Sequence, residues 1–238
     1  MIHSKYCLHL IIATSLLVTL SGCGTKERHN PKDPWEGYNR AIFSFNEGVD
    51  RALIKPVAKG YDTIIPGPIN TIITNFFNNI GDVPIAINNL LQGKVMESAS
   101  DLGRVILNST LGIGGLIDVA TGMTLEKHDE DFGQTFAHWG IGNGPYFMLP
   151  LIGPSTIRDS FGLVADWNTD PLLYVHPYRV RDSLSGLRQI DKRADLLTAE
   201  KVIDAGAIDK YRYLREAYFQ RRNYLIYDGM PPREEEYE

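Results

Sequence analysis

Cys23 has the clearest potential chemistry in the chain, because it directly follows Leu20, Ser21 and Gly22. A leucine three positions before a cysteine, with two small residues between them, resembles a bacterial lipobox. There the thiol accepts a diacylglyceryl group, and cleavage makes the cysteine the new N-terminus. The preceding apolar run, residues 10–20, is too short to cross a bilayer, which takes about 20 residues, but it suits a signal peptide. An ordinary signal peptide with an incidental cysteine is the alternative.

Other motifs that could carry chemistry are weak. Asp131-Phe132-Gly133 spells a kinase metal motif, but no nucleotide loop or catalytic loop accompanies it. The glycines of 140–144 lack the strand and helix of a dinucleotide fingerprint. The acidic and histidine residues of 128–138 fit no metal-ligand spacing, and Ser155 lacks a nucleophile elbow. We therefore expect no catalytic residue, no metal and no cofactor, apart from diacylglyceryl and N-acyl lipid on Cys23.

The composition sets the class of protein. The chain has 238 residues, 43% of them hydrophobic and 22% charged, with a formal net charge of -5. These values are typical of a globular domain and argue against nucleic-acid binding, which needs a basic face. We expect a signal peptide (1–22), a lipidated tether (23–32), one mostly helical domain (33–230) and an acidic tail (231–238).

Amphipathic helices are the elements that must position any site. Asp33, Pro34 and Glu36 suggest a capping box that starts a helix, and Pro56 should end it. We expect Gly81 and Pro84 to split the next helical segment in two, with Gly93 closing the second part. Further helices are expected near 95–108, at 156–164, within 179–204 and at 209–227. Residues 132–153, rich in glycine and aromatic residues, lack helical periodicity and suggest a hairpin or an extended loop.

The segment 63–93 is unusual because Asp82 is its only charged residue. At the chain's own charged fraction, about seven charges would be expected over these 31 residues. The polar face opposite its Ile and Phe residues consists of Asn and Thr. A buried core whose Asn side chains bond loop backbone is one explanation. Membrane embedding is the other, and we favour it because lipid disfavours charge far more than neutral amides.

Longer stretches show a resemblance to the MlaA (VacJ) family of outer-membrane lipoproteins. They are DPWEGYNRAIFSFNEGVD (33–50), KPVAKGYDTIIPGPI (55–69), NLLQG (89–93), GRVILNSTLGIGGLIDVA (103–120), DFGQTFAHWGIGNGPYFMLPLIGPSTIRDSFG (131–162) and REAYFQRR (215–222). They run through most of the chain expected after signal cleavage. The resemblance implies a ring-like helical body embedded in the inner, periplasmic leaflet of the outer membrane, with a central amphipathic channel. It implies that stray outer-leaflet phospholipids pass through it to a periplasmic carrier of the MlaC type, and that trimeric porins are partners.

Within this framework we expect a non-enzymatic lipid conduit with a neutral polar lining. The candidate lining residues are Asn75, Asn78, Asn79, Asn88 and Asn89, and the candidate gate is the loop of Gly140, Gly142 and Gly144. Two alternatives are a lipid-anchored, porin-binding scaffold without its own lipid path, and a phospholipase-like enzyme.

Overall fold

The computed structural model describes residues 30–232, and most of them are helical. The predicted signal peptide, Cys23 and nearly all of the acidic tail lie outside these residues. The helices in chain order are α2 (Glu36–Val49), the π-helical turn η1 (Asp50–Ile54), α3 (Lys55–Ile64), α4 (Gly67–Leu91), α5 (Val95–Thr110), α6 (Val119–Gly122), α7 (Phe132–His138), α8 (Ile157–Thr169), the 3₁₀ turn η2 (Pro171–Tyr174), α9 (Tyr178–Asp195), α10 (Leu197–Gly206) and α11 (Lys210–Ile226). The mostly helical class expected from the sequence is confirmed.

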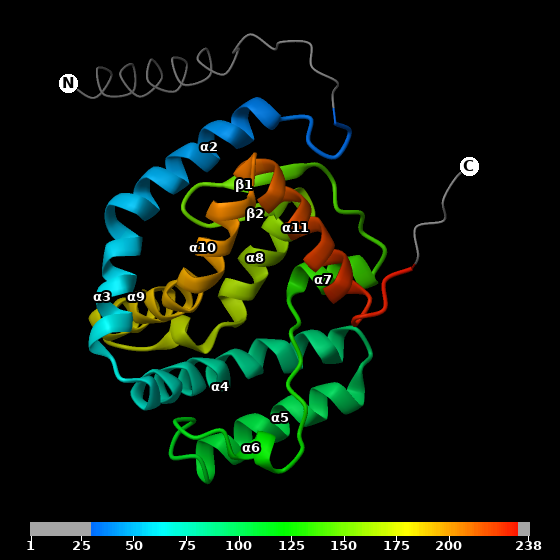
Figure 1. Cartoon of the computed structure of the whole chain (residues 1–238). Coiled ribbons are helices and arrows are strands. Elements are labelled where there is room, and N and C mark those ends of the chain that lie inside the picture. The colour runs from blue at the N-terminus through cyan, green and yellow to red at the C-terminus, as the bar shows by residue number, and fades with distance from the viewer. Residues whose placement is uncertain (1–29, 233–238) are drawn as a thin grey trace, which may run out of the picture.

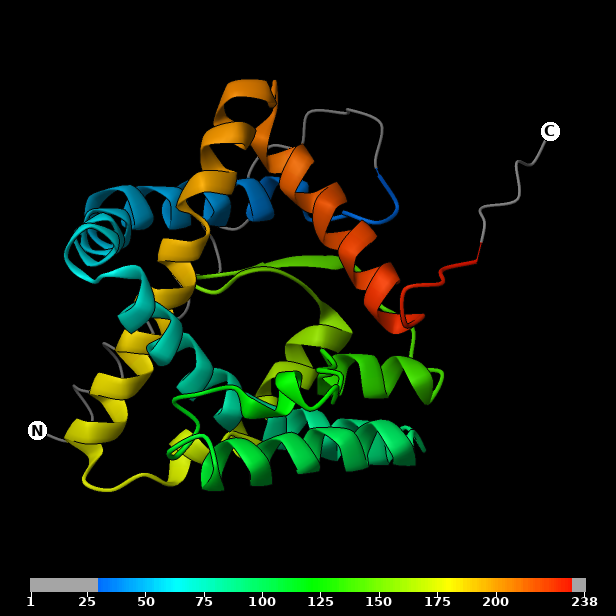
Figure 2. The same ribbon diagram turned by 60° about the horizontal axis from the view of Figure 1, so that its bottom comes forward.

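Several of the longer helices and α7 enclose the rest of the molecule in Figure 1, where α8 and α10 lie inside that outline. α2 and α3 run along one edge, α4 and α5 form the base, and α7 and α11 close the opposite side. Figure 2 shows the α4–α5 base at one end of the molecule and the α10–α11 corner at the other. A small hairpin lies between them, with β1 (Tyr146–Leu149) antiparallel to β2 (Gly153–Thr156).

Pro56 does not end the first helix as predicted, since the chain continues from α2 through η1 into α3. Pro56 is the second residue of α3, directly after the π-helical turn. A proline costs most inside a helix, where it removes a backbone hydrogen bond and collides with the preceding turn. The change of helical register at η1 places it in a first turn, where its missing N–H is tolerated.

The predicted break at Gly81 and Pro84 is also wrong, because α4 is one helix of 25 residues. α5 packs along it in the most extensive helix–helix contact among the described residues, and this packing outweighs the local cost of Pro84. Gly93 does follow the helix end as predicted, with φ of 79°. This left-handed conformation closes helices and favours glycine.

The glycine- and aromatic-rich region contains both the predicted hairpin and a helix that the sequence analysis missed. Tyr146 pairs with Thr156 and Leu149 with Gly153 across the hairpin. Upstream, α7 is capped by Asp131, whose carboxylate accepts a hydrogen bond from the Gln134 N–H at 2.9 Å. The helix has seven residues, too few for its periodicity to stand out.

Asp33 does not form the predicted capping box, because α2 begins at Glu36 with no side-chain cap. Its buried carboxylate instead accepts hydrogen bonds from Tyr211 Oη at 2.5 Å, Arg215 Nη1 at 2.8 Å and Asn39 Nδ2 at 2.8 Å. Asn39 then accepts from the Met148 N–H at 2.8 Å. This polar tie joins α2, β1 and α11.

Hydrophobic burial is limited. One cluster combines Ala58, Ala194 and Leu197, and another combines Tyr146, Met148 and Tyr211. Among residues 30–232, buried polar or charged side chains outnumber buried hydrophobic ones. Burying a polar group costs free energy unless it is hydrogen-bonded, so the fold depends on the partners of these groups.

We predict that Arg215→Met lowers the free energy of unfolding by about 3–5 kcal/mol, since it leaves the Asp33 carboxylate buried without its cation. Arg212→Met, on an exposed position of the same helix, should change it by less than about 0.5 kcal/mol. Denaturant unfolding of the two variants checks this, and equal losses would contradict the role of the tie.

Candidate functional site

The α4–α5 pair is inside out relative to a protein in water, because it buries polar side chains and exposes apolar ones. The buried residues of α5 are Ser98, Asp101, Arg104 and Asn108, which recur every three or four positions and so share one helical face. Their opposite face exposes aliphatic side chains, among them Leu102 and Ile106, the latter 62% exposed. α4 likewise buries Asn79, Asp82, Asn88 and Asn89 and exposes Leu90 and Leu91.

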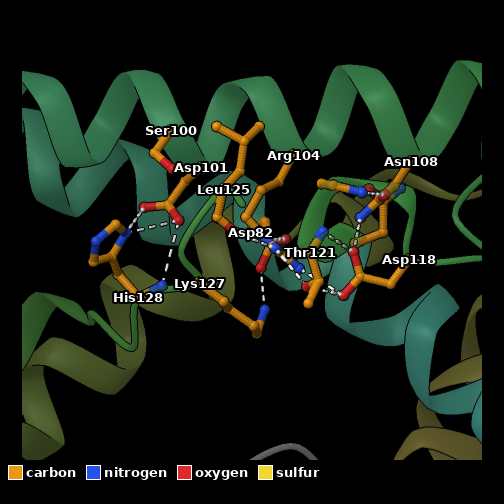
Figure 3. Close-up of polar contacts among 12 residues, drawn as sticks. Asp82, Ser100, Asp101, Arg104, Asn108, Asp118, Thr121, Leu125, Lys127 and His128 are labelled. Carbon is orange, nitrogen blue, oxygen red and sulfur yellow. Dashed lines mark hydrogen bonds and ion pairs between the residues drawn. The ribbon is translucent and has the colours of Figure 1, made fainter. Parts of the chain in front are cut away.

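Arg104 holds the centre of this polar interior and is 1% exposed. Its Nε donates to Asp82 Oδ2 at 3.2 Å, and its Nη2 donates to Asp118 Oδ2 at 2.9 Å. Its Nη1 donates to Thr121 Oγ1 at 3.0 Å and to the Leu125 carbonyl at 2.8 Å. Figure 3 shows these groups between α4, α5 and the chain that follows α6. A buried guanidinium is tolerated here because its donors meet carboxylates and hydroxyls.

Two carboxylates of this polar interior, Asp101 and Asp118, have further partners. Asp101 accepts from Asn89 Nδ2 at 2.8 Å, and His128 Nδ1 lies 3.1 Å from the same carboxylate. Burial alone would raise the pKa of Asp118, but hydrogen bonds from Thr121, and from Arg104 and Asn108 among other groups, lower it to about 2. Asp118 is therefore ionised at neutral pH and compensates the charge of Arg104.

An extended segment, residues 124–131, lies against this pair, and we name it the strap. Lys127 in the strap contacts Asp82, while Glu130 accepts from Gln92 Nε2 at 2.7 Å and from Lys94 Nζ at 2.8 Å. The strap thus joins the α4–α5 pair to α7, which begins directly after it.

This network was not predicted from the sequence, in which the helix near 95–108 has both an apolar and a polar stripe. The signal was present: Ser98, Asp101, Arg104 and Asn108 have the same helical spacing as Ala99, Leu102 and Ile106. Deciding which stripe faces inward requires the partner charges Asp82 and Asp118, which lie elsewhere in the chain.

Two of the predicted lining residues, Asn88 and Asn89, are fully buried. Asn88 accepts a hydrogen bond from Thr135 Oγ1 at 2.7 Å and donates to the Pro84 carbonyl at 2.9 Å. Asn89 donates to Asp101. Their amides hold α4 to its neighbours, so this placement does not support a role in lining an open path.

The other three predicted lining residues differ in their burial. Asn79 is buried and donates to Ser109 Oγ at 2.9 Å, and Asn75 is half-buried and donates to the Leu116 carbonyl at 3.2 Å. The Asn75 contact matches the alternative explanation, in which Asn side chains bond loop backbone, whereas Asn79 binds a side chain of α5. Asn78 is exposed and lines a cavity.

That cavity, of about 630 Å³, lies between α4, the strap, α8, η2 and α9, and we name it the α4–α9 cavity. Its wall is charged, unlike the neutral lining expected from the sequence. The acidic and basic groups in its lining are Asp129, Glu130, Asp131, Asp166, Asp170, Asp191, Asp195, Lys127, Arg188 and Lys192.

A second cavity, of about 650 Å³, lies between the α2–α3 segment and α9, α10 and α11, and we name it the α2–α10 cavity. Charged pairs form one part of its wall: Arg193 binds Asp50 and Glu200, and Lys55 binds Glu200. Its other part is apolar and includes Phe43, Met148, Leu196, Ile203 and Leu214. The cavity is therefore amphipathic, a property that suits a molecule with polar and apolar ends.

The predicted gate residues Gly140, Gly142 and Gly144 lie in an exposed loop between α7 and β1. Gly140 and Gly144 have positive φ angles of 85° and 65°, which glycine adopts without strain. A Cβ at Gly144 would also lie 3.2 Å from Ile157. These observations explain the glycines, and movement of the loop stays a prediction.

No helix among residues 30–232 combines the length and the apolar character needed to cross a bilayer. Within the same residues, no three His, Cys, Asp or Glu side chains gather in a way that could hold a metal ion. Cys23 lies outside the described part of the chain, and its lipidation stays a prediction.

Asp166 in the wall of the α4–α9 cavity should make the stability of the protein depend on pH. Burial, reinforced by Asp131 and Asp159 and opposed by the Phe132 N–H, raises its pKa to about 7, from about 3.9 in an unfolded chain. The folded state therefore binds the extra proton between these values, and the free energy of unfolding falls as pH rises from about 4 to about 7. Asp166→Asn keeps an acceptor for Phe132 and should remove this loss.

We expect Asp166→Asn to be more stable than the unmodified protein at pH 8, with the difference shrinking toward pH 4, as measured by denaturant unfolding across this range. A difference that is constant with pH would contradict the raised pKa.

Comparison with known proteins agrees with these features. The family model described as MlaA lipoprotein matches residues 31–225. The chain is 35% identical over 225 residues to the Escherichia coli K12 protein named intermembrane phospholipid transport system lipoprotein MlaA, covering 92% of this chain and 88% of that one. A Haemophilus influenzae protein of the same name is 30% identical over 233 residues, covering 92% and 91%.

A solved structure from work on the maintenance of bacterial outer membrane lipid asymmetry has a similar fold. The TM-score is 0.72 at 35% identity, and the match covers 82% of this chain and 98% of that chain. The family model matches most of this chain, and the two relatives are 35% and 30% identical to it. The chain therefore belongs to the MlaA lipoprotein family.

Proposed function

We propose that this protein is an outer-membrane lipoprotein that forms a channel for phospholipids. It removes phospholipids that have strayed into the outer leaflet and passes them to a periplasmic lipid carrier of the MlaC type, which maintains lipid asymmetry. Two relatives are named as components of an intermembrane phospholipid transport system, and neither name is that of an enzyme. This naming supports transport over the phospholipase alternative.

The observation that carries the proposal is the inside-out α4–α5 pair. In water, exposed Leu102 and Ile106 together with buried Asp82 and Arg104 would be unfavourable on both faces. Among acyl chains the arrangement becomes favourable. A charge at mid-bilayer costs about 2.5–3.5 kcal/mol, so the charges belong inside and the aliphatic side chains outside. We therefore place this pair within the periplasmic leaflet, with Cys23 carrying the lipid anchor.

The two cavities support a conduit over a scaffold without a lipid path. A scaffold without a lipid path needs binding surfaces only on its outside. This chain also has two cavities with charged walls, although removing charged groups from water costs free energy. In the proposed path the headgroup follows the charged walls, and apolar residues such as Phe43 and Leu214 accompany the acyl chains. The Gly140–Gly144 loop serves as the movable gate, and trimeric porins are the proposed outer-membrane partners.

A bulky side chain in the α4–α9 cavity tests the conduit. Asn78→Trp fills the hollow from an exposed position, so phospholipid should accumulate in the outer leaflet to near the level of a strain that lacks the protein. Intact-cell labelling of outer-leaflet phospholipid measures this. Thr71→Trp, at an exposed α4 position outside both cavities, should leave the outer leaflet normal. A normal outer leaflet with correctly localised Asn78→Trp protein would sink the assignment.

Spin labels test the proposed membrane depth. If Cys23 is lipidated and the signal peptide removed, an introduced cysteine is the one free thiol of the chain. Labels at Leu102→Cys and Ile106→Cys should be accessible to oxygen and protected from a water-soluble relaxation agent. A label at Lys201→Cys, in the α10 corner at the far end of the molecule, should show the reverse. Equal exposure to the aqueous agent at all three positions would exclude the embedded arrangement.

A further inference from the structure

The wall of the α4–α9 cavity carries an excess of negative charge. Seven carboxylates and three Lys or Arg side chains line it. Four of the carboxylates are paired with a cation: Asp129 with Arg221, Glu130 with Lys94, Asp131 with Arg222 and Asp170 with Arg188. The remaining three, Asp166, Asp191 and Asp195, have no ion-pair partner within residues 30–232.

Asp191 is the most unusual of the three, because it is 2% exposed. Its carboxylate accepts from Tyr61 Oη at 2.9 Å and from Thr74 Oγ1 at 3.2 Å, both neutral hydroxyls. A buried carboxylate is expensive unless a cation compensates it. Among the described residues its carboxylate accepts hydrogen bonds but forms no salt bridge, so a cation supplied by a ligand would complete the site.

Asp195 lies one helical turn further along α9, and residues four apart share a helix face. Its pKa is raised by burial and then by the negative charge of Asp191, as expected for two carboxylates without a cation between them. Both line the same cavity. Together they form a place for one positively charged group.

Lys192 provides the complementary charge in the same wall. Partial desolvation and the neighbouring positive charge of Arg188 lower its pKa, while Asp129, Asp170 and Asp191 oppose this shift. Lys192 forms no salt bridge among residues 30–232. An anionic group entering the cavity would meet it. Exposed Trp167 adds an aromatic face to the lining, and such faces attract ammonium groups.

We propose that this cavity selects phospholipids whose headgroup combines an ammonium with the phosphate. Asp191 and Asp195 bind the ammonium, and Lys192 binds the phosphate. A headgroup with a neutral alcohol in place of the ammonium leaves both carboxylates uncompensated and brings a net negative charge into an acidic cavity, so it binds less well. This inference rests on the proposed phospholipid path and assigns its headgroup preference.

Competition between two lipids tests the inference. The full-length lipidated protein in detergent is mixed with equal amounts of dihexanoyl phosphatidylethanolamine and dihexanoyl phosphatidylglycerol, and native mass spectrometry gives the ratio bound. Because both lipids share one sample, differences in micelle content cancel. We expect the ethanolamine lipid to be favoured about tenfold, the effect of one charge-assisted hydrogen bond.

Three variants separate the roles. Asp191→Asn with Asp195→Asn should bring the ratio close to one, while Lys192→Gln should weaken both lipids alike and keep the ratio. Asp195→Asn alone, at an exposed position, should lower the ratio and guards against a folding defect at buried Asp191. Asp182→Asn, an exposed α9 carboxylate outside both cavities, is the matched control and should change nothing.

A ratio near one in the unmodified protein, or a ratio that the Asp195 variants leave unchanged, would overturn the headgroup preference. Absence of binding by either lipid would overturn it as well. Failure of the proposed function is a different result: cells that lack the protein would then keep a normal outer leaflet. Cells that need the protein but handle both lipids equally would refute the preference alone.

Discussion

The burial of Arg104 between α4 and α5 is the constraint on which the α4–α5 base depends. A guanidinium that is 1% exposed requires compensation, and three separate segments supply it: Asp82 from α4, Asp118 from the loop before α6, and carbonyl and hydroxyl oxygens from the chain that follows. Because Lys127 of the strap also contacts Asp82, the network fixes the path of the chain toward α7. The positions of α4, α5 and the strap therefore follow from satisfying one buried charge.

The same constraint determines which side chains of the α4–α5 base are exposed. Once polar groups occupy the inner faces of both helices, the aliphatic residues at the alternate positions must point outward. Limited hydrophobic clusters elsewhere and polar ties such as Asp33 with Arg215 show the same preference for internal hydrogen bonds. A protein solvated partly by acyl chains gains little from hiding apolar side chains and much from hiding charged ones. This physical reason connects the fold to a membrane leaflet.

The two cavities differ in how their charges are arranged. One is amphipathic with salt bridges in its wall, and the other is acidic with three carboxylates that form no ion pair among the described residues. The sequence predicted a neutral path, whereas the walls of both cavities carry charges. Charges of both signs on the wall offer a different solution, because a zwitterionic headgroup can exchange one set of partners for another as it moves. In the mechanism that we propose, the charged wall would select the headgroup and still release it.

The sequence by itself determined the mostly helical class, the unusual absence of charge in 63–93 and the resemblance to the family, and it left a hairpin and an extended loop as alternatives for 132–153. These properties depend on composition, local periodicity and long stretches of similar residues. It did not determine that α4 continues through Pro84, that Asp33 binds Arg215 instead of capping a helix, or that Asn88 and Asn89 are internal ties. Each of these depends on contacts between elements, which local sequence patterns do not specify. Two stripes of equal periodicity on α5 predict a helix but not which stripe faces inward. Only the tertiary structure decided that, because it brings Asp82, Asp118 and Lys127 to the polar stripe and leaves the apolar one outside.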